Sequence, residues 1–320
     1  MPSAIEYAPH LAKYHIVKLF NASPSKKPMF DQLGIIGCGL MGSSFALAMK
    51  RAGLVKRIVG YSKSPTTTAR ALQMGVIDVE AASALQAVSG SDIVLVAVPV
   101  AATEATLKAI KHMITPGMLL MDVGSTKRDV VDSAQRTLGS SLGTFVPAHP
   151  IAGKELSGVE HADVNLYMGR QVILTPIGKT FTAQLLKAED VWTALGCSVQ
   201  SMSPDAHDAA FAAVSHLPHL LAFAMMDSIT SQKQAADYLT LAGSGFRDFT
   251  RIAASDPKMW HDILLANRTQ VLEQIGHYKH SLQALEPMNS NNDSPALEAA
   301  ISAASQARSQ WHLTSTKQKK

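Results

Sequence analysis

The sequence predicts an α/β fold, with a Rossmann-type parallel sheet in an N-terminal domain and an all-helical domain after it. Between residues 33 and 149, short apolar runs alternate with longer amphipathic stretches, a pattern typical of βαβ units. Beyond Pro204 this alternation stops, and apolar residues recur at helical spacing. The chain has 320 residues, of which 47% are hydrophobic and 17% charged, so it is long enough for two packed domains.

We expect four segments along the chain. They are a poorly ordered N-terminal extension (1–30), a Rossmann-type domain (31–203), a helical domain (204–312) and a basic tail (313–320). The longest apolar run, 93–102, contains Pro99 and is well short of the roughly 20 residues that span a membrane. The sequence therefore predicts no membrane segment.

Charge and cysteine content narrow the class of partner. The net charge is +4 and only 6% of residues are aromatic, without the basic stripe interleaved with aromatic residues that a nucleic-acid interface needs. Cys38 and Cys197 provide neither a disulfide framework nor a metal-ligand spacing, which favours a reducing, cytoplasmic location. We expect a small anionic ligand and no nucleic acid.

The strands of the first domain are expected in a fixed order. They lie at 33–36, 58–61, 93–97, 118–122 and 144–146, with helices such as 43–52 and 101–113 between them. A strand at 172–175, a helix at 181–195 and a strand at 199–202 extend this domain. Right-handed crossovers bring the carboxyl ends of parallel strands to one rim, where ligands bind. We expect this rim to carry Gly37, Ser62, Pro99, Ser125 and His149.

The second domain is expected to consist of helices alone. They lie at 205–230, 233–241, 244–253, 257–285 and 294–311. The stretch 209–226 is so apolar that its surface must be buried against other helices or against a second subunit.

A glycine-rich loop follows the first strand and opens the first helix. It reads Gly37-Cys38-Gly39-Leu40-Met41-Gly42, and this context makes the Gly-x-Gly-x-x-Gly pattern a credible dinucleotide fingerprint. Small residues let the backbone approach a pyrophosphate, and the helix N-terminus supplies N–H groups and a positive dipole end. We expect Val98 and Pro99, which follow the third strand, to line the same cofactor site.

The end of the second strand determines which cofactor we expect. In the fingerprint an Asp or Glu about 20 residues on holds the ribose 2′-hydroxyl, whereas this chain has Ser62-Lys63-Ser64 at that place. A 2′-phosphate would meet hydroxyl groups and an ammonium there instead of a repelling carboxylate. The sequence therefore favours NADP, with NAD as the alternative if Lys63 is an ordinary solvated lysine.

A histidine and a serine are the candidates for chemistry at the rim. His149 follows the last apolar strand, and Pro150 and Gly153 after it predict that it lies on a fixed loop. Ser125 ends the preceding strand region and presents a hydroxyl near it, while Thr126 is expected to cap the next helix.

The helical domain contributes two further pairs of polar residues. His216 and His219 lie three apart on one helix face, and because we identify no third ligand near them, we expect hydrogen bonding to a ligand or loop and no metal. Arg247 and Arg251 lie four apart at a glycine-rich helix start, and the fork of arginine suits a carboxylate ligand. The alternative is that Arg247 pairs with a neighbouring aspartate on the surface.

Together these motifs resemble the prephenate/arogenate dehydrogenase family of tyrosine biosynthesis over about residues 31–285. The resemblance implies a homodimer through the helical domain, an active site between the two domains, and NAD(P)-dependent oxidative decarboxylation of a cyclohexadienol. It implies that His149 accepts the proton of the 4-hydroxyl and that Ser125 binds this hydroxyl or orients His149. It also implies that Arg251 binds a substrate carboxylate, supported by His219 and Arg247.

The substrate side chain and the reaction class leave alternatives. Glu155 could meet the ammonium of arogenate, which would favour arogenate or dual use over prephenate alone; equally, it could be a surface acid that pairs with Lys154 or Arg170. A β-hydroxyacid or imine dehydrogenase begins with a similar loop but uses a catalytic lysine in its helical domain. A non-catalytic, cofactor-sensing Rossmann dimer is the third alternative.

Overall fold

The structure, a computed structural model, describes residues 28–154 and 156–311. In this part of the chain a parallel sheet of six strands has the order β3-β2-β1-β4-β5-β6. Its strands are β1 (Phe30–Ile36), β2 (Val55–Tyr61), β3 (Val79–Glu80), β4 (Ile93–Val96), β5 (Leu119–Asp122) and β6 (Phe145–Val146). The Rossmann-type first domain is confirmed, and the order reverses between β1 and β4, where such sheets open a crevice for ligands.

Helices cover both faces of this sheet. They are α1 (Leu40–Arg51), α2 (Pro65–Gln73), α3 (Ala84–Val88), α4 (Thr103–Ile110), α5 (Arg128–Thr137) and α6 (Thr182–Ala194). Successive side chains of a strand point to opposite faces, so Leu33 and Ile35 pack with α1 and α6 whereas Ile36 packs in a second apolar cluster. Burial on both faces explains why the strands read as continuous apolar runs.

Several elements differ from the sequence prediction. Strand β1 begins earlier than expected because Phe30 is buried and pairs with Val55 of β2. Strand β3 and helices α2 and α3 were not predicted, since each is short and carries too few apolar residues to show a period. The fold class is unaffected, because β3 adds an edge strand to the predicted sheet, and α2 and α3 add helices that pack against it.

A second sheet contains the histidine that we expected on a loop. Within the described residues its order is β7 (Ala148–Pro150), β8 (Gln171–Leu174) and β9 (Ser198–Ser201). The loop prediction is wrong, because His149 pairs with Ile173 in an antiparallel ladder between β7 and β8. Pro150 is tolerated there since β7 is an edge strand, whose outer side needs no N–H group. A strand gives His149 a more fixed backbone than a loop would.

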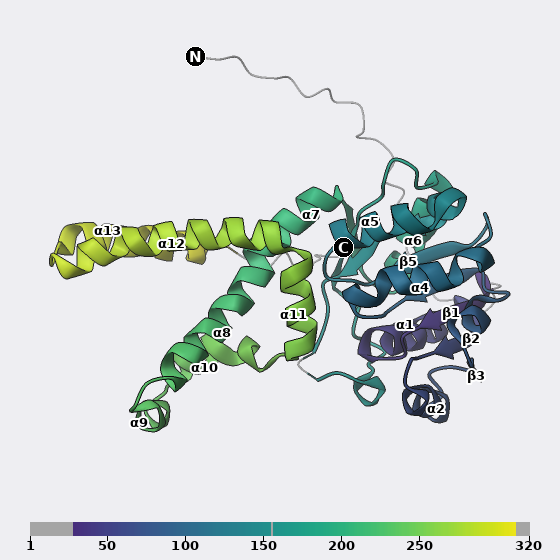
Figure 1. The fold of residues 1–320 in the computed structure, drawn as a ribbon, viewed down its shortest axis with the longest axis horizontal. Coiled ribbons are helices and arrows are strands. Elements are labelled where there is room, and N and C mark those ends of the chain that lie inside the picture. The colour runs from purple at the N-terminus through teal and green to yellow at the C-terminus, as the bar shows by residue number, and fades with distance from the viewer. Residues whose placement is uncertain (1–27, 155, 312–320) are drawn as a thin grey trace, which may run out of the picture.

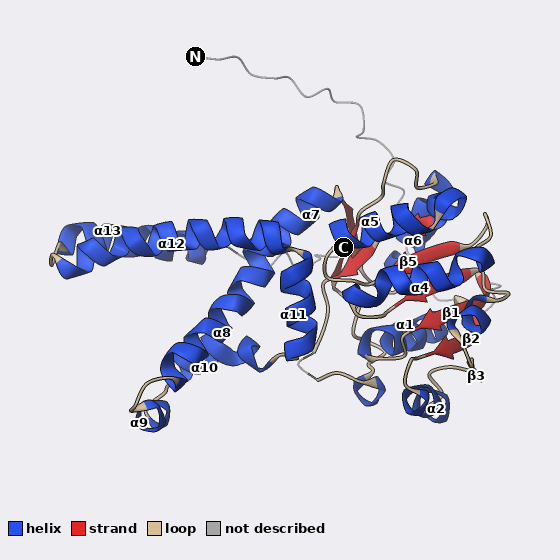
Figure 2. Cartoon of the chain, in the orientation of Figure 1, coloured by secondary structure: helices blue, strands red, loops and turns tan. Residues whose placement is uncertain are grey.

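The second domain is helical throughout its described part (Figures 1 and 2). Helix α7 (Pro204–Phe211) continues through a π-helical turn, Ala212–His216, into α8 (Leu217–Thr230). The bounds of the helices after it are α9 (Ala235–Thr240), α10 (Ser244–Thr250), α11 (Pro257–Ala266), α12 (Arg268–Ser290) and α13 (Ser294–Gln310). Helices α12 and α13 pack together as an arm that extends away from the sheet, whereas α11 lies against the Val100–Ala102 turn after β4 (Figure 1).

The expectation of one continuous helix over 257–285 is wrong. The helix breaks at Asn267, whose backbone has φ −103° and ψ 28° between α11 and α12. The buried Asn267 side chain donates to the carbonyl of Asp208 at 2.7 Å. A hydrogen bond to another element thus overrides the apolar period that runs through this stretch.

The helical domain leaves much apolar surface uncovered in the single chain. Within the described residues only Ala222 of α8 is buried, and Val214, Leu241 and Leu282 are among the exposed apolar side chains. By length and composition alone Pro204–Thr230 could cross a membrane. Its first turns, however, carry His207 and Asp208, which are buried against the first domain. We therefore interpret the run as a domain helix.

Candidate active site

The glycine loop between β1 and α1 has the shape that a dinucleotide requires. Gly37 has φ +104°, and a Cβ atom on it would lie 2.3 Å from the carbonyl oxygen of Ala97. A Cβ on Gly42 would lie 2.1 Å from the carbonyl oxygen of Gly37, so both glycines are needed for the loop to pack. Gly39, in contrast, has nothing within 4 Å of such a Cβ, and no side chain caps α1. These features fit a pyrophosphate at the helix N-terminus.

The predicted ribose-binding residues lie beside this loop. The hydroxyl of Ser62, directly after β2, accepts a hydrogen bond from the backbone N–H of Cys38 at 2.8 Å. Lys63 and Ser64 are exposed at the start of α2, and the Ser64 hydroxyl lies 2.8 Å from that of Thr66. The three residues directly after β2 thus carry two hydroxyl groups and an ammonium, and none of them is a carboxylate.

The other predicted cofactor residues occupy the same edge. Leu40 is buried and Met41 is half-buried at the start of α1, where the carbonyl of Met41 accepts from the Tyr167 hydroxyl at 2.7 Å. Val98 is half-buried and Pro99 exposed immediately after β4. Strands β1 and β4 are neighbours, so these residues flank the crevice beside the glycine loop.

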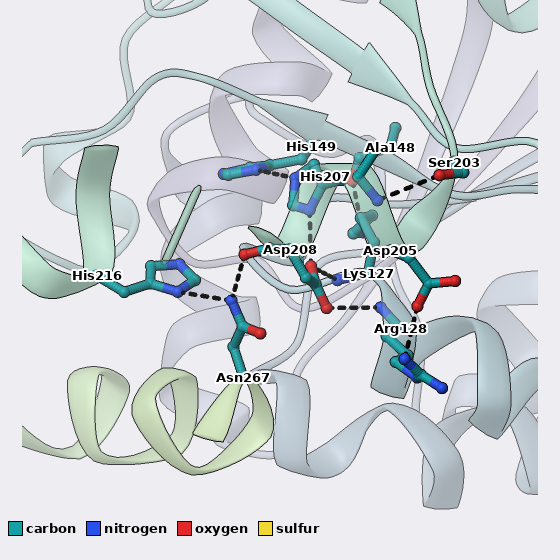
Figure 3. Close-up of polar contacts among 12 residues, drawn as sticks. Lys127, Arg128, Ala148, His149, Ser203, Asp205, His207, Asp208, His216 and Asn267 are labelled. Carbon is teal, nitrogen blue, oxygen red and sulfur yellow. Dashed lines mark hydrogen bonds and ion pairs between the residues drawn. The ribbon is translucent and has the colours of Figure 1, made fainter. Parts of the chain in front are cut away.

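His149 is held by residues of the second domain (Figure 3). Its Nδ1 atom lies 2.8 Å from Nε2 of His207, and Nδ1 of His207 lies 2.7 Å from Oδ1 of Asp208. Both partners belong to α7. The ring of Phe211, one turn further along α7, packs on both imidazoles with centroid distances of 4.7 and 4.5 Å.

The Asp208 side chain also caps the N-terminus of α5 in the first domain. Its Oδ1 accepts from the backbone N–H of Lys127 at 2.8 Å and its Oδ2 from that of Arg128 at 3.0 Å. The expectation that Thr126 caps this helix is wrong, because its side chain makes no capping bond and a carboxylate takes the place. An anion is favoured there by the helix dipole as well as by the two N–H groups.

A buried ion pair holds the strand that carries His149. The ammonium of Lys127 pairs with Asp122 at the end of β5 and donates to the carbonyl of Ala148 at 2.8 Å. The other Asp122 oxygen accepts from the Ala148 backbone N–H at 3.1 Å. Both polar groups of Ala148 are thus fixed, and His149 follows it in the chain.

Burial controls the charge of the three aligned groups. Desolvation holds the pKa of His149 well below its ordinary value, and the repulsion that a charged His149 would meet from His207 and Lys127 lowers this pKa further. Burial also lowers the pKa of His207, although the bond to Asp208 opposes the change. Burial would raise the pKa of Asp208, but hydrogen bonds from His207 and from two backbone N–H groups outweigh it and lower that pKa. Near neutral pH this gives an anionic Asp208 and two neutral imidazoles.

The two histidines of the π-helical turn and α8 have separate partners. His216 is buried, its Nδ1 lies 3.1 Å from Nδ2 of Asn267, and burial lowers its pKa to about 4. His219 stacks on Trp260 at a centroid distance of 3.6 Å, and its Nδ1 lies 2.9 Å from the carbonyl oxygen of Ser215. Over the described chain no group of three side chains is arranged to hold a metal ion.

The remaining predicted residues lie at the margins of this site. Ser125 is half-buried in the β5–α5 loop, two residues before Lys127. Arg251 is exposed, and its positive charge adds to burial in lowering the pKa of His219. Arg247 is exposed and pairs with Asp248 at 3.2 Å, as in the surface alternative. Glu155 lies outside the described residues.

Sequence reasoning missed His207, Asp208 and Asn267. The stretch 205–230 is mostly apolar, and its apolar residues indicate a subunit or domain interface. A signal was nevertheless present, because His207 and Asp208 are adjacent polar residues in the first turns of an apolar helix. Residues in such a position are either solvated or buried with partners.

Two family models match successive parts of the chain. The nucleotide-binding domain of prephenate dehydrogenase matches residues 45–201, and its dimerization domain matches residues 203–303. The prephenate dehydrogenase of Bacillus subtilis is 35% identical over 271 residues, which cover 84% of this chain and 73% of that protein. The cyclohexadienyl dehydrogenase of Zymomonas mobilis is 32% identical over 267 residues, covering 83% and 90%.

A solved structure is also similar over most of its length. It is the prephenate dehydrogenase of Aquifex aeolicus in complex with hydroxyphenyl propionate and NAD⁺. Its TM-score is 0.82 at 36% sequence identity, and the match covers 88% of this chain and 98% of that one.

The buried pair predicts a large loss of stability when one partner is removed. In Lys127→Met, Asp122 keeps its charge in a dry environment and Ala148 loses its hydrogen-bond donor, so the free energy of unfolding should fall by about 3–5 kcal/mol. Denaturant titration measures the change. The control is Lys56→Met, which removes an exposed pair with Asp31 and should cost less than about 1 kcal/mol. Equal losses in the two variants would contradict the role given to Lys127.

Proposed function

The chain belongs to the prephenate dehydrogenase family, and we propose that it catalyses the oxidative decarboxylation of prephenate, of arogenate, or of both with a nicotinamide cofactor. The observation that carries this proposal is the placement of His149. It lies at the carboxyl edge of a Rossmann sheet and is backed by two residues of the helical domain. The family assignment leaves the β-hydroxyacid or imine dehydrogenase and the non-catalytic sensor without support.

The proposed chemistry gives each side chain one task. A bound nicotinamide supplies the acceptor for the hydride that leaves the ring carbon bearing the 4-hydroxyl. His149, neutral because it is desolvated, accepts the hydroxyl proton. As the ring carboxylate leaves as CO₂, its bonding electrons make the ring aromatic and the proton returns to the phenolic oxygen. Ser125 binds the reacting hydroxyl or orients His149, and Arg251 holds a substrate carboxylate with His216, His219 and Arg247 in support.

We infer NADP as the preferred cofactor, with NAD as the alternative. The support is chemical: hydroxyl groups and the Lys63 ammonium follow β2, and Ser62 already accepts a bond from Cys38. Its hydroxyl hydrogen therefore remains available to a phosphate oxygen. The Aquifex aeolicus relative has NAD⁺ bound, which is why both cofactors must be compared directly.

The side chain of the substrate distinguishes arogenate from prephenate. We propose that Glu155 pairs with the ammonium of arogenate, which gives arogenate or dual use. Steady-state rates with prephenate and with arogenate, each with NAD and with NADP, follow from the absorbance of the reduced cofactor. A value of kcat/KM for prephenate at least tenfold above that for arogenate would contradict the role of Glu155.

We also propose a cytoplasmic homodimer. Apolar side chains on α8 and α12 are uncovered in the single chain, and this region matches a family dimerization domain. Both cysteines, Cys38 and Cys197, are buried and unpaired, in keeping with a reducing compartment. No nucleic-acid or membrane partner enters this proposal.

Replacement of the base tests the proposed chemistry. His149→Asn removes the proton acceptor but keeps a polar side chain, so kcat should fall on the order of 100- to 10,000-fold while substrate binding survives. Initial rates and equilibrium binding measure the two effects. The control is His112→Asn, the same replacement at an exposed position after α4, which should leave kcat unchanged. An unaltered kcat in His149→Asn would remove this mechanism.

Replacement at the end of β2 tests the cofactor assignment. In Ser62→Asp a carboxylate would repel a 2′-phosphate and accept from a 2′-hydroxyl, so the NADP/NAD ratio of kcat/KM should fall at least about tenfold, or roughly 1.4 kcal/mol. The control is Ser309→Asp on α13, which adds the same charge at an exposed site of the helical arm. If the ratio stays constant in Ser62→Asp, the assignment of Ser62 is wrong.

A further inference from the structure

Two residues of α7, His207 and Asp208, lie in line behind His149 and have no task in the chemistry described so far (Figure 3). We propose that they are positioning residues, which fix the proton of His149 on Nδ1 and leave Nε2 as the atom that accepts the substrate proton. The proposal deepens the function proposed above, because it states which nitrogen acts and what holds it ready. The hydrogen bonds of Asp208, His207 and His149, taken in that order, lead to this proposal.

The Asp208 carboxylate determines which nitrogen of His207 carries a proton. Its carboxylate accepts the backbone N–H groups of Lys127 and Arg128 and also contacts Nδ1 of His207 at 2.7 Å. An ionised carboxylate can only accept hydrogen bonds. Nδ1 of His207 must therefore carry a proton and donate it to Asp208.

The other ring nitrogen of His207 determines the direction of its hydrogen bond with His149. This ring is fully buried and lies near the buried Lys127 ammonium, which disfavours a second positive charge. A neutral imidazole that is protonated on Nδ1 has a lone pair on Nε2. Nε2 of His207 thus accepts the 2.8 Å hydrogen bond, and Nδ1 of His149 donates it.

The direction of this hydrogen bond leaves Nε2 of His149 as the atom that can accept a proton. With its proton on Nδ1, a neutral His149 keeps its lone pair on Nε2, on the side of the ring away from His207. After His149 accepts a proton from the substrate, its Nδ1–H group still points to His207, with the negative charge of Asp208 at the end of the line. The rings cannot turn freely, because Phe211 packs on both of them.

The arrangement joins the two domains. His149 belongs to β7 of the first domain, whereas His207 and Asp208 belong to the helical domain. Asn267, at the break between α11 and α12, donates to the carbonyl of Asp208 and so holds the start of the line. The proton position on the base is therefore set by contact between the domains and does not depend on bound substrate.

The tautomer can be measured directly. We expect ¹⁵N chemical shifts of the histidine-labelled, substrate-free dimer near neutral pH to show His149 protonated on Nδ1 and unprotonated on Nε2. The His149→Asn variant assigns the signal. A His149 ring protonated on Nε2, or one that exchanges between both tautomers, would overturn the proposal. The chemical-shift measurement needs no turnover, so its result is independent of whether the protein oxidises prephenate or arogenate.

Two replacements of His207 separate positioning from packing. Gln can place an amide oxygen near the position of Nε2 and accept from His149, whereas Phe keeps the ring volume and removes both polar atoms. His207→Phe should lower kcat on the order of 10- to 100-fold with the substrate KM within about twofold of wild type. His207→Gln should recover most of this loss.

Two outcomes of these variants would contradict the proposal. One is a folded His207→Phe protein with wild-type kcat; the other is equal impairment of the Phe and Gln variants, which would indicate a packing role alone. If His207→Phe does not fold, the Gln variant and the tautomer measurement still decide the matter. Failure of the proposed function would look different, because the wild-type protein itself would oxidise neither substrate.

Discussion

The contact on which most of this structure depends is the Asp208 carboxylate at the N-terminus of α5. This carboxylate belongs to the helical domain, and it accepts hydrogen bonds from two backbone N–H groups of the nucleotide-binding domain. Because an isolated buried carboxylate would be strongly unfavourable, these bonds and the bond to His207 must form together. The same residue connects α7 with α5, accepts from Asn267 at the helix break through its backbone carbonyl, and begins the line of groups that reaches His149.

Opposite charges alternate beneath the site. Asp122, Lys127 and Asp208 are all buried, and each hydrogen-bonds to a backbone group as well as to a charged or polar side chain. Such a network contributes less to net stability than to specificity, because replacement of the whole set by apolar residues could be neutral while loss of one member is costly. Its effect here is positional, since it fixes both polar groups of Ala148, the residue before His149.

The sequence predicted well those features that depend on neighbouring residues. The glycine loop, the strands of the main sheet and the helical nature of residues 204–311 follow from local patterns, and the fold class they predicted is confirmed. The features that were missed depend on distant partners: β7 needs β8 to become a strand, and Asn267 breaks a helix because of Asp208. Thr126 was expected to cap α5 because its hydroxyl was the only nearby acceptor visible in the sequence, whereas the cap comes from Asp208, about 80 positions away. The partners of His207, His149 and Asp208, likewise become visible only in the folded chain, although its place among apolar residues is a local signal.

Burial of His149 creates a difficulty that the line of groups behind it resolves. A histidine whose pKa lies well below neutrality is always ready to accept a proton, but by itself it is a poor base. In the proposed mechanism the imidazolium is stabilised as it forms by the negative charge of Asp208, which acts through His207. An anionic substrate would add negative charge in front of the ring while Asp208 provides it behind. On this proposal the base is neutral in the free protein and becomes stronger when the substrate carboxylates arrive, so proton acceptance is coupled to binding of the correct ligand.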